Sequence, residues 1–127
     1  MIFGIGHDIV ENSRISFLLN KYGQRFVTKI LSSQEQEIFL KRTDKVNYLA
    51  KRFAAKESFA KACNTGLRSP VLLTHISILN DALGKPVFQF STTLQQWLTT
   101  HRITACHVSL SDENNLSSAF VILEINS

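Results

Sequence analysis

The 127-residue sequence predicts an α+β domain in which a helical N-terminal half packs on an antiparallel sheet. Two observations support this class. After one N-terminal strand, helix-forming segments and their stop signals fill the chain up to Gly66, and alternating strand patterns dominate the remainder. A chain of this length has room for one core, so we expect residues 1–127 to form a single domain. A functional cleft would then use that domain or an interface between copies of the chain.

Residues 2–10 alternate as a strand that places Asp8 on the same side as Gly4 and Gly6. Glycine weakens a strand, and one reason to keep it is the close approach of a ligand or of another backbone. A bulge or tight strand packing is the structural alternative. Asp8 is therefore a candidate site residue, whereas His7 points to the other side.

Ser13 is expected to cap a helix that ends at Tyr22, with Gly23 as its stop. Arg14 and Lys21 lie seven residues apart and share one face of this helix, and Arg25 extends the basic edge past the glycine. The edge is either a solvated surface or a docking face for an acidic partner.

Two further helices are expected before the chain changes character. Ser32 and Glu35, overlapping with Ser33 and Gln36, form capping-box patterns that begin a short helix ending near Arg42. Thr43 or Asp44 then caps a long helix that begins near Lys45, and Thr65-Gly66 is its predicted stop.

Within the long helix, charged and apolar residues share one third of the circumference: Phe53, Glu57, Ala60, Lys61 and Asn64. Glu57 and Lys61 fit an ordinary solvated i,i+4 pair. They also fit a partly buried carboxylate and ammonium that face a cleft, where the first could hold a metal ion and the second a phosphate.

The second half of the chain predicts strands at residues 76–80 and 87–90 around a turn at residues 83–86, then a helix capped by Ser91. Strands at residues 103–111 and 117–125 follow, joined by a polar turn at residues 112–115. His107, Ser109 and Ser111 share one strand face and could donate hydrogen bonds to an anion, although a lone strand histidine is also common as a structural residue.

Composition limits the classes of function. The formal net charge of +4 favours an acidic partner, whether a nucleic acid, a phosphate-bearing metabolite or an acidic protein. Cys63 and Cys106 have neither zinc-site spacing nor disulfide density. No apolar run approaches the roughly 20 residues that span a bilayer, and no signal-like segment begins the chain, so we expect a soluble, cytoplasmic protein without membrane contact.

The ordered set of motifs resembles the holo-[acyl-carrier-protein] synthase family, the short bacterial-type 4′-phosphopantetheinyl transferases. The resemblance covers nearly the whole chain and rests on these segments in order: Gly6-His-Asp8 with Arg14, Phe53-Ala-Ala-Lys-Glu57-Ser-Phe-Ala-Lys61-Ala, Gly84-Lys85-Pro86, and His107-Val-Ser-Leu-Ser111-Asp112. The chain departs from many relatives at Asn64, where they have glycine, and at Leu83, where a polar residue often precedes the turn.

The resemblance implies that the chain transfers the 4′-phosphopantetheine arm of coenzyme A to a serine of apo acyl carrier protein, in fatty acid biosynthesis. Adenosine 3′,5′-bisphosphate is the implied second product. The resemblance also implies the 4′-phosphopantetheinyl transferase fold and a homotrimer with active sites at its subunit interfaces.

Site residues follow from the same motifs. Asp8 and Glu57 are the implied Mg²⁺ ligands, and two carboxylates with diphosphate oxygens suit this ion. Lys61 would neutralise phosphate charge, and Glu57 is our candidate for the general base. Residues expected to bind coenzyme A are Arg52, Lys61, Gly84, Lys85, Pro86 and His107; those expected to dock the acidic carrier protein are Arg14, Lys21 and Arg25.

Two other classes of function fit parts of the sequence. A basic module that binds nucleic acid is permitted by the charge, but the phenylalanines fall at core positions and no compact Lys/Arg tract is present. A metal-dependent phosphohydrolase would use the same scaffold and release adenosine bisphosphate without a carrier protein.

Overall fold

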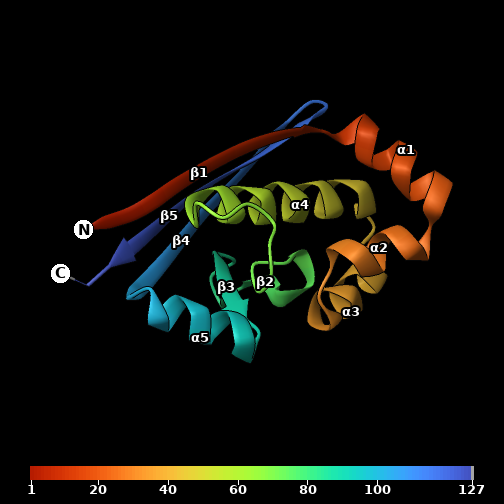
Figure 1. The fold of residues 1–127 in the computed structure, drawn as a ribbon. Helices are drawn as coiled ribbons and strands as arrows, with labels where there is room; N and C mark the ends of the chain where they lie inside the picture. Colours follow the sequence, from red (N-terminus) through yellow and green to blue (C-terminus); the bar gives the residue numbers. More distant parts are fainter. Residues whose placement is uncertain (127) are drawn as a thin grey trace.

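The computed structural model describes residues 1–126 and confirms the α+β class. Figure 1 shows the arrangement of its elements in space. In chain order they are β1 (Ile2–Glu11), α1 (Asn12–Tyr22), α2 (Gln24–Ile30), α3 (Ser33–Lys41), α4 (Lys45–Ala62), the 3₁₀ helix η1 (Leu73–His75), β2 (Ile76–Asn80), β3 (Pro86–Phe90), α5 (Thr92–Thr100), β4 (Ile103–Glu113) and β5 (Leu116–Ile125).

The predicted antiparallel sheet is two separate sheets. Strands β1, β5 and β4 form a three-stranded antiparallel sheet in that order, so the first and last strands of the chain are neighbours. Strands β2 and β3 form a hairpin of their own. Helix α4 lies between the two sheets, and α1, α2 and α3 gather around the end of α4 where the helix begins (Figure 1). α4 is therefore the central element of the domain.

Glycine lets β1 and α4 approach closely. A Cβ atom at Gly4 would overlap the carbonyl oxygen of Ala62, and one at Gly6 would overlap the carbonyl oxygen of Ser58. The two glycines thus allow the close approach of another backbone, that of α4, and leave no space there for a ligand. The Ser58 hydroxyl adds a hydrogen bond of 3.0 Å to the carbonyl of Ala119 on β5.

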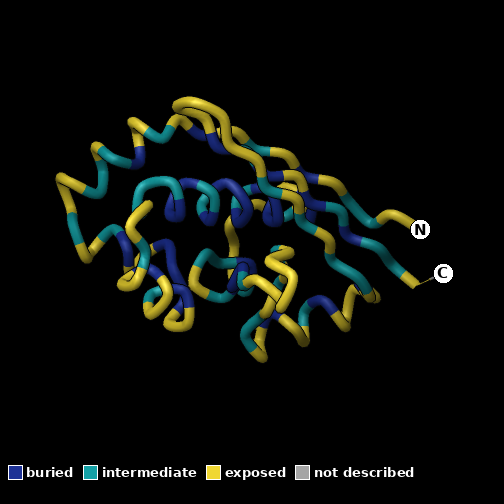
Figure 2. The backbone as a smooth tube through the Cα atoms, turned by 180° about the vertical axis from the view of Figure 1, so that it is seen from behind, coloured by how far each residue is buried: buried dark blue, intermediate teal, exposed yellow. Residues whose placement is uncertain are grey.

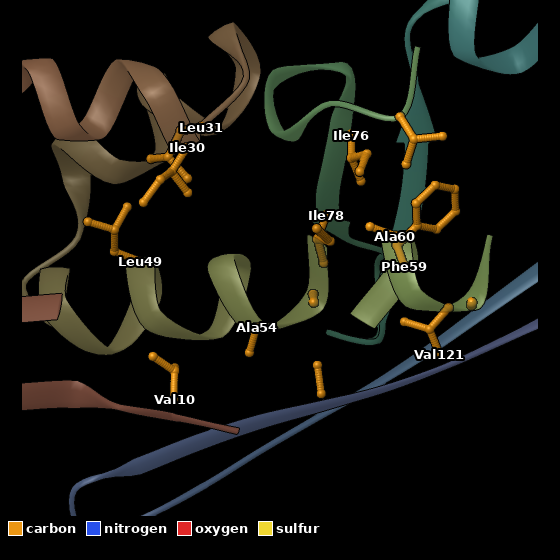
Figure 3. Close-up of a cluster of buried hydrophobic side chains, with 14 of the residues drawn as sticks. Val10, Ile30, Leu31, Leu49, Ala54, Phe59, Ala60, Ile76, Ile78 and Val121 are labelled. Atoms are coloured by element: carbon orange, nitrogen blue, oxygen red, sulfur yellow. The ribbon is translucent and has the colours of Figure 1, made fainter. Parts of the chain in front are cut away.

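The core surrounds α4 on several sides (Figure 3). Val10 and Val121 pack between α4 and the three-stranded sheet, and Ile78 packs on its other side, toward the β2–β3 hairpin. Phe59 of α4 has its ring centroid 5.2 Å from that of Phe88 and 5.1 Å from that of Phe90. The backbone coloured by burial shows α4 as a dark segment inside more exposed strands and helices (Figure 2).

Two helix ends differ from the sequence prediction. Ser13 does not cap α1, which begins at Asn12; the side chain of Asn115, from the β4–β5 turn, accepts the Ser13 N–H at 2.9 Å instead. Helix α4 ends at Ala62, short of Thr65-Gly66, because Asn64 already adopts the left-handed conformation at φ 65°.

The chain after Gly23 forms a further helix, α2, that was not predicted from the sequence. Arg25, at the end of the basic edge, lies in this helix. The polar turn is shorter than predicted: β4 continues to Glu113 and β5 begins at Leu116.

Other boundaries are confirmed. Ser32 and Glu35 form the predicted capping box at the start of α3, and Ser91 accepts the Leu94 N–H at the start of α5. α4 begins at Lys45, although Asp44 makes no side-chain cap and pairs with Arg42 instead. Within the described part of the chain, no helix combines the length and apolarity needed to cross a bilayer.

Candidate functional site

The first group of candidate residues lies where α4 crosses β1. The Lys61 ammonium donates to the Asp8 carboxylate oxygen Oδ1 at 3.0 Å and to the His7 carbonyl at 3.0 Å. This contact spans two elements, so Lys61 does more than form a local helix pair with Glu57. The close packing at Gly4 and Gly6 fixes the distance between the two backbones that carry these charges.

The Glu57 carboxyl belongs to the same group. Burial raises the pKa of Glu57 above its ordinary value, and the nearby charge of Asp8 raises it further, while Lys61 and Arg14 act in the opposite direction. Two carboxylates that repel each other in a partly buried position favour a cation between or beside them.

These residues fit the implied magnesium ion as a donor set. Mg²⁺ takes hard oxygen ligands, often one or two carboxylates together with water and substrate phosphate oxygens. Among residues 1–126 no cluster of three or more His, Cys, Asp or Glu side chains could hold a metal ion by itself. Asp8 and Glu57 would therefore need oxygen atoms from a bound phosphate compound and from water to complete a coordination shell.

A second group lines a cavity of about 290 Å³ between the β2–β3 hairpin and β4. Lys85, Pro86 and His107 all contribute to it, so three of the residues expected to bind coenzyme A do come together. The His107 Nε2 atom lies 2.6 Å from Glu124 Oε1 on β5. Glu124 was not predicted as a site residue, since its pairing with His107 depends on strand register.

A third group surrounds Arg52 at a neighbouring cavity of about 500 Å³, which Gly84, Lys85 and Pro86 also line. Arg52 is only 4 % exposed, and burial lowers the pKa of its guanidinium. Two more basic residues, Arg42 and Lys51, line the same cavity and were missed as site candidates. Lys51 could have been found as the neighbour of Arg52 on α4, whereas the position of Arg42 depends on how α3 and α4 meet.

The candidate docking residues Arg14, Lys21 and Arg25 are all exposed, the first two on α1 and the third on α2. The Lys21 ammonium lies 5.8 Å from the ring centroid of Phe17 and 5.3 Å from that of Tyr22. Arg25 also lines a cavity of about 300 Å³, together with four residues that were not predicted to dock a partner: Leu18, Tyr22, Phe26 and Lys29. Basic and apolar side chains thus line this hollow together.

Asp8 and His107 lie on different strands and different faces of the sheet. β1 and β4 are its two edges, with β5 between them. Asp8 points to the α4 side, where it meets Lys61, whereas His107 is exposed on the outer side beside Glu124. That outer face also carries exposed apolar residues, namely Ile5 at 58 %, Ile9 at 56 % and Phe120 at 42 %. Within one copy of the chain, Asp8 and His107 therefore lie on opposite faces of the sheet and cannot meet.

Comparison with known sequences identifies the family of the chain. The family model described as the 4′-phosphopantetheinyl transferase superfamily matches residues 4–119. A holo-[acyl-carrier-protein] synthase of Nitrosospira multiformis is 52 % identical over 124 residues, which cover 98 % of this chain and 99 % of the relative. The protein of the same name from Laribacter hongkongensis is 48 % identical with the same coverage.

Solved structures agree with the sequence relatives. A crystal structure of holo-[acyl-carrier-protein] synthase from Neisseria meningitidis superposes with a TM-score of 0.96 at 48 % identity, covering 98 % of this chain and 99 % of that one. The enzyme of the same name from Bacillus anthracis, in complex with CoA (3′,5′-ADP), superposes with a TM-score of 0.84 at 34 % identity and covers 99 % of both chains.

Proposed function

The chain belongs to the 4′-phosphopantetheinyl transferase superfamily, and from this premise we propose that it is a holo-[acyl-carrier-protein] synthase. It transfers the 4′-phosphopantetheine arm of coenzyme A to a serine of apo acyl carrier protein, for fatty acid biosynthesis, and releases adenosine 3′,5′-bisphosphate. The observation that carries the proposal is the cluster of Asp8, Glu57 and Lys61 at the crossing of β1 and α4.

The reaction needs charge neutralisation and alignment more than covalent chemistry from the protein. The serine oxygen of the carrier forms a bond to the β-phosphorus of coenzyme A, and the bond from that phosphorus to the bridging oxygen breaks. Lys61 neutralises negative charge on the phosphates. Glu57 accepts the serine proton, directly or through a water molecule, and the raised pKa of its carboxyl makes it a stronger base.

Asp8 and Glu57 would hold Mg²⁺, which supplies charge neutralisation on the diphosphate when bound. The support for this proposal is the chemistry of the two carboxylates and their mutual repulsion, which a divalent cation would relieve. Lys61 already lies within hydrogen-bond distance of Asp8, so it orients that carboxylate before any ligand arrives.

The nucleotide end of coenzyme A would lie against Arg52, Gly84, Lys85, Pro86 and His107. Support comes from the two neighbouring cavities that these residues line, both of which include Lys85 and Pro86. Four basic side chains gather at the larger one, which suits the phosphate groups of adenosine 3′,5′-bisphosphate.

The acidic carrier protein would dock on Arg14, Lys21 and Arg25. Exposed positive charge on α1 and α2 would speed the encounter and fix its orientation. Support comes from Arg14, whose charge lowers the pKa of the Glu57 carboxyl, so this basic residue lies near one of the proposed reacting groups.

We further propose a homotrimer of a single-domain chain, with each active site at an interface. Two observations support it: Asp8 and His107 face opposite sides of the sheet, and the outer face carries exposed Ile5, Ile9 and Phe120. A neighbouring copy would cover this apolar face and bring its His107 toward the Asp8 of the first copy. A cytoplasmic location is proposed on the free thiols of Cys63 and Cys106.

Intact-mass analysis tests the function. The protein is incubated with coenzyme A, Mg²⁺ and apo acyl carrier protein, and the carrier is expected to gain one phosphopantetheine arm. Asp8→Ala and Glu57→Ala should each abolish the gain without loss of folding, while Glu37→Ala, a matched exposed carboxylate on α3, should not. Chelation of the metal should stop transfer, and added Mg²⁺ should restore it.

Several outcomes would contradict the proposal. No mass gain beside a working transferase would refute the function. Release of adenosine bisphosphate without any carrier would indicate a phosphohydrolase, and salt-sensitive binding of nucleic acid without affinity for coenzyme A would indicate a binding module.

The trimer has its own test. Asp8→Ala and His107→Ala variants, each inactive alone, are mixed and allowed to exchange subunits. If each site uses both residues from different copies, about a quarter of the sites in the mixture regain both native residues and activity returns. A mixture that stays inactive after proven exchange would count against the shared site.

A further inference from the structure

Arg52 is held in an unusual state for a basic side chain. Its guanidinium is buried in the wall of the 500 Å³ cavity, and its Nε is the one buried side-chain nitrogen or oxygen in residues 1–126 that lacks a hydrogen-bond partner. A buried guanidinium with spare donor capacity is costly unless an anion or a fixed set of neighbours compensates it. The neighbours of Arg52 therefore decide where its remaining donors point.

Two contacts hold the guanidinium on the protein side. One terminal nitrogen donates to the Ile78 carbonyl on β2 at 3.2 Å. The guanidinium carbon lies 4.1 Å from the ring centroid of Tyr48, one helical turn earlier on α4, in a cation–π arrangement. Together the Ile78 carbonyl and the Tyr48 ring restrain the position and the plane of the Arg52 guanidinium.

Both of these neighbours are bound to the same residue, Glu35. Its carboxylate oxygen Oε2 accepts the Ile78 N–H at 2.8 Å, and its main-chain carbonyl accepts the Tyr48 hydroxyl at 3.5 Å. Glu35 thus contacts Ile78, whose carbonyl binds Arg52, through its side chain, and the hydroxyl of Tyr48, whose ring lies against the guanidinium, through its main chain.

Glu35 is itself fixed by a buried ion pair. Its second oxygen accepts the Ser32 N–H at 3.0 Å and the Lys56 ammonium at 2.5 Å, and both side chains of the pair are fully buried. Lys56 also donates to the Ile30 carbonyl at 2.6 Å, so it links α2, α3 and α4. Ile30 and Ile78, which both bond to this pair, lie on the side of α4 opposite to Val10 and the three-stranded sheet (Figure 3).

We propose that Glu35, held by Lys56, is a positioning residue for Arg52, and that the pair presets Arg52 for a phosphate group at the nucleotide end of coenzyme A. This inference rests on the function proposed above and assigns a role to residues that touch no substrate. The ion pair fixes the carboxylate that holds Ile78, whereas an apolar pair of similar volume would serve stability without holding that residue.

The role predicts a selective loss of nucleotide affinity. In the double variant Glu35→Gln/Lys56→Met both charges are removed together, so no uncompensated ion is left buried. Glutamine has an oxygen at only one of the two carboxylate positions, so it cannot hold the Ser32 and Ile78 N–H groups as the carboxylate does, and Ile78 loses its fixed position. Binding of adenosine 3′,5′-bisphosphate should weaken about tenfold, the loss expected when one charge-assisted hydrogen bond is misplaced.

The experiment compares four proteins by calorimetric titration with adenosine 3′,5′-bisphosphate and by transfer kinetics. They are the unmodified chain, the double variant, Arg52→Met and the control Val27→Ala, which truncates a buried side chain on α2 away from this cavity. The KM for coenzyme A should rise in the double variant and in Arg52→Met, while the KM for the carrier protein stays the same in both. Val27→Ala should lower the melting temperature without changing either KM.

The outcomes separate the two claims. If the unmodified chain binds neither coenzyme A nor the bisphosphate, the proposed function fails and the inference falls with it. If the unmodified chain binds and the folded double variant binds equally well, only the inference is overturned. Should the double variant not fold, Glu35→Asp keeps the charge for Lys56 but withdraws the carboxylate from Ile78; unchanged bisphosphate affinity in that variant would also overturn the inference.

Discussion

Replacement of Gly6 by alanine tests whether the close contact of β1 with α4 sets the geometry of the candidate site. The new Cβ would overlap the Ser58 carbonyl oxygen and lie 2.8 Å from the Ser58 carbonyl carbon and 3.0 Å from the Ala62 nitrogen. All three atoms belong to the backbone of α4, so no side-chain rotation relieves the overlap. The strand must move away from the helix.

The magnitude follows from two opposing effects. Overpacking of this kind costs about 1–3 kcal/mol, and backbone partners place Gly6→Ala at the upper end. The lower entropy of the unfolded alanine chain returns about 0.4–1 kcal/mol. A net loss of about 2 kcal/mol remains, which corresponds to a fall in melting temperature of about 6–10 °C.

Activity should fall by more than stability explains. Asp8 lies two residues after Gly6 on the same strand face, and Ser58 is next to Glu57, so the displacement separates the two carboxylates directly. A displacement of about 1 Å can reduce a rate by about a hundredfold. Transfer is measured by intact mass at a temperature where the variant remains folded by circular dichroism.

Gly66→Ala is the matched control for this substitution. Its φ of +67° makes alanine strained there, but nothing lies within 4 Å of the added carbon. It should lose about 1 kcal/mol of stability and keep its transfer rate. If Gly6→Ala retained both the unmodified melting temperature and full activity, the proposed link between strand packing and site geometry would be wrong.

Three further predictions concern charge and protonation. Because the pKa of Glu57 is raised in the folded state, ionisation of its carboxyl opposes folding. Glu57→Gln should therefore have a higher melting temperature than the unmodified chain near pH 8, and the difference should vanish below the ordinary pKa of glutamate. Equal melting temperatures of the two proteins near pH 8 would refute this. Arg14→Glu should raise the KM for the carrier protein about tenfold and leave the KM for coenzyme A unchanged, and an unaltered carrier dependence would remove Arg14 from the docking surface. Burial raises the pKa of Cys63 to about 12 and that of Cys106 to about 11. At pH 8 iodoacetamide should therefore alkylate Cys63 in the folded chain about a thousandfold more slowly than a free thiol. Rapid labelling of Cys63 in the folded chain would contradict its burial.

The sequence predicted best those features that depend on neighbours along the chain. The Ser32–Glu35 capping box and the strand at Ile76–Asn80 occur where the patterns placed them. The local pattern gave a wrong prediction at the start of α1, where the expected cap was the Ser13 side chain. There the side chain of Asn115, far along the sequence, accepts the Ser13 N–H instead. The local pattern also failed at Asn64, where a residue other than glycine adopts the left-handed conformation first.

The same division applies to the candidate site. The i,i+4 spacing correctly placed Glu57 and Lys61 near each other, and strand alternation correctly placed Asp8 on the side of the glycines. The sequence could not indicate that Lys61 pairs with Asp8, or that Glu124 pairs with His107, because both contacts depend on how separate elements pack. For the same reason the roles of Glu35 and Lys56 were not visible before their partners were known.

The pairing of the first strand with the last has a consequence for how the protein is made. Asp8 pairs with Ala119, so β1 leaves the ribosome long before its partner strand exists. Until then α4 and the helices around it can form, but Asp8 has no fixed position beside Glu57. Contacts between such distant residues form slowly. The proposed site for metal and diphosphate would therefore form only when nearly all of the chain had been synthesised, which ties the appearance of activity to the completion of the fold.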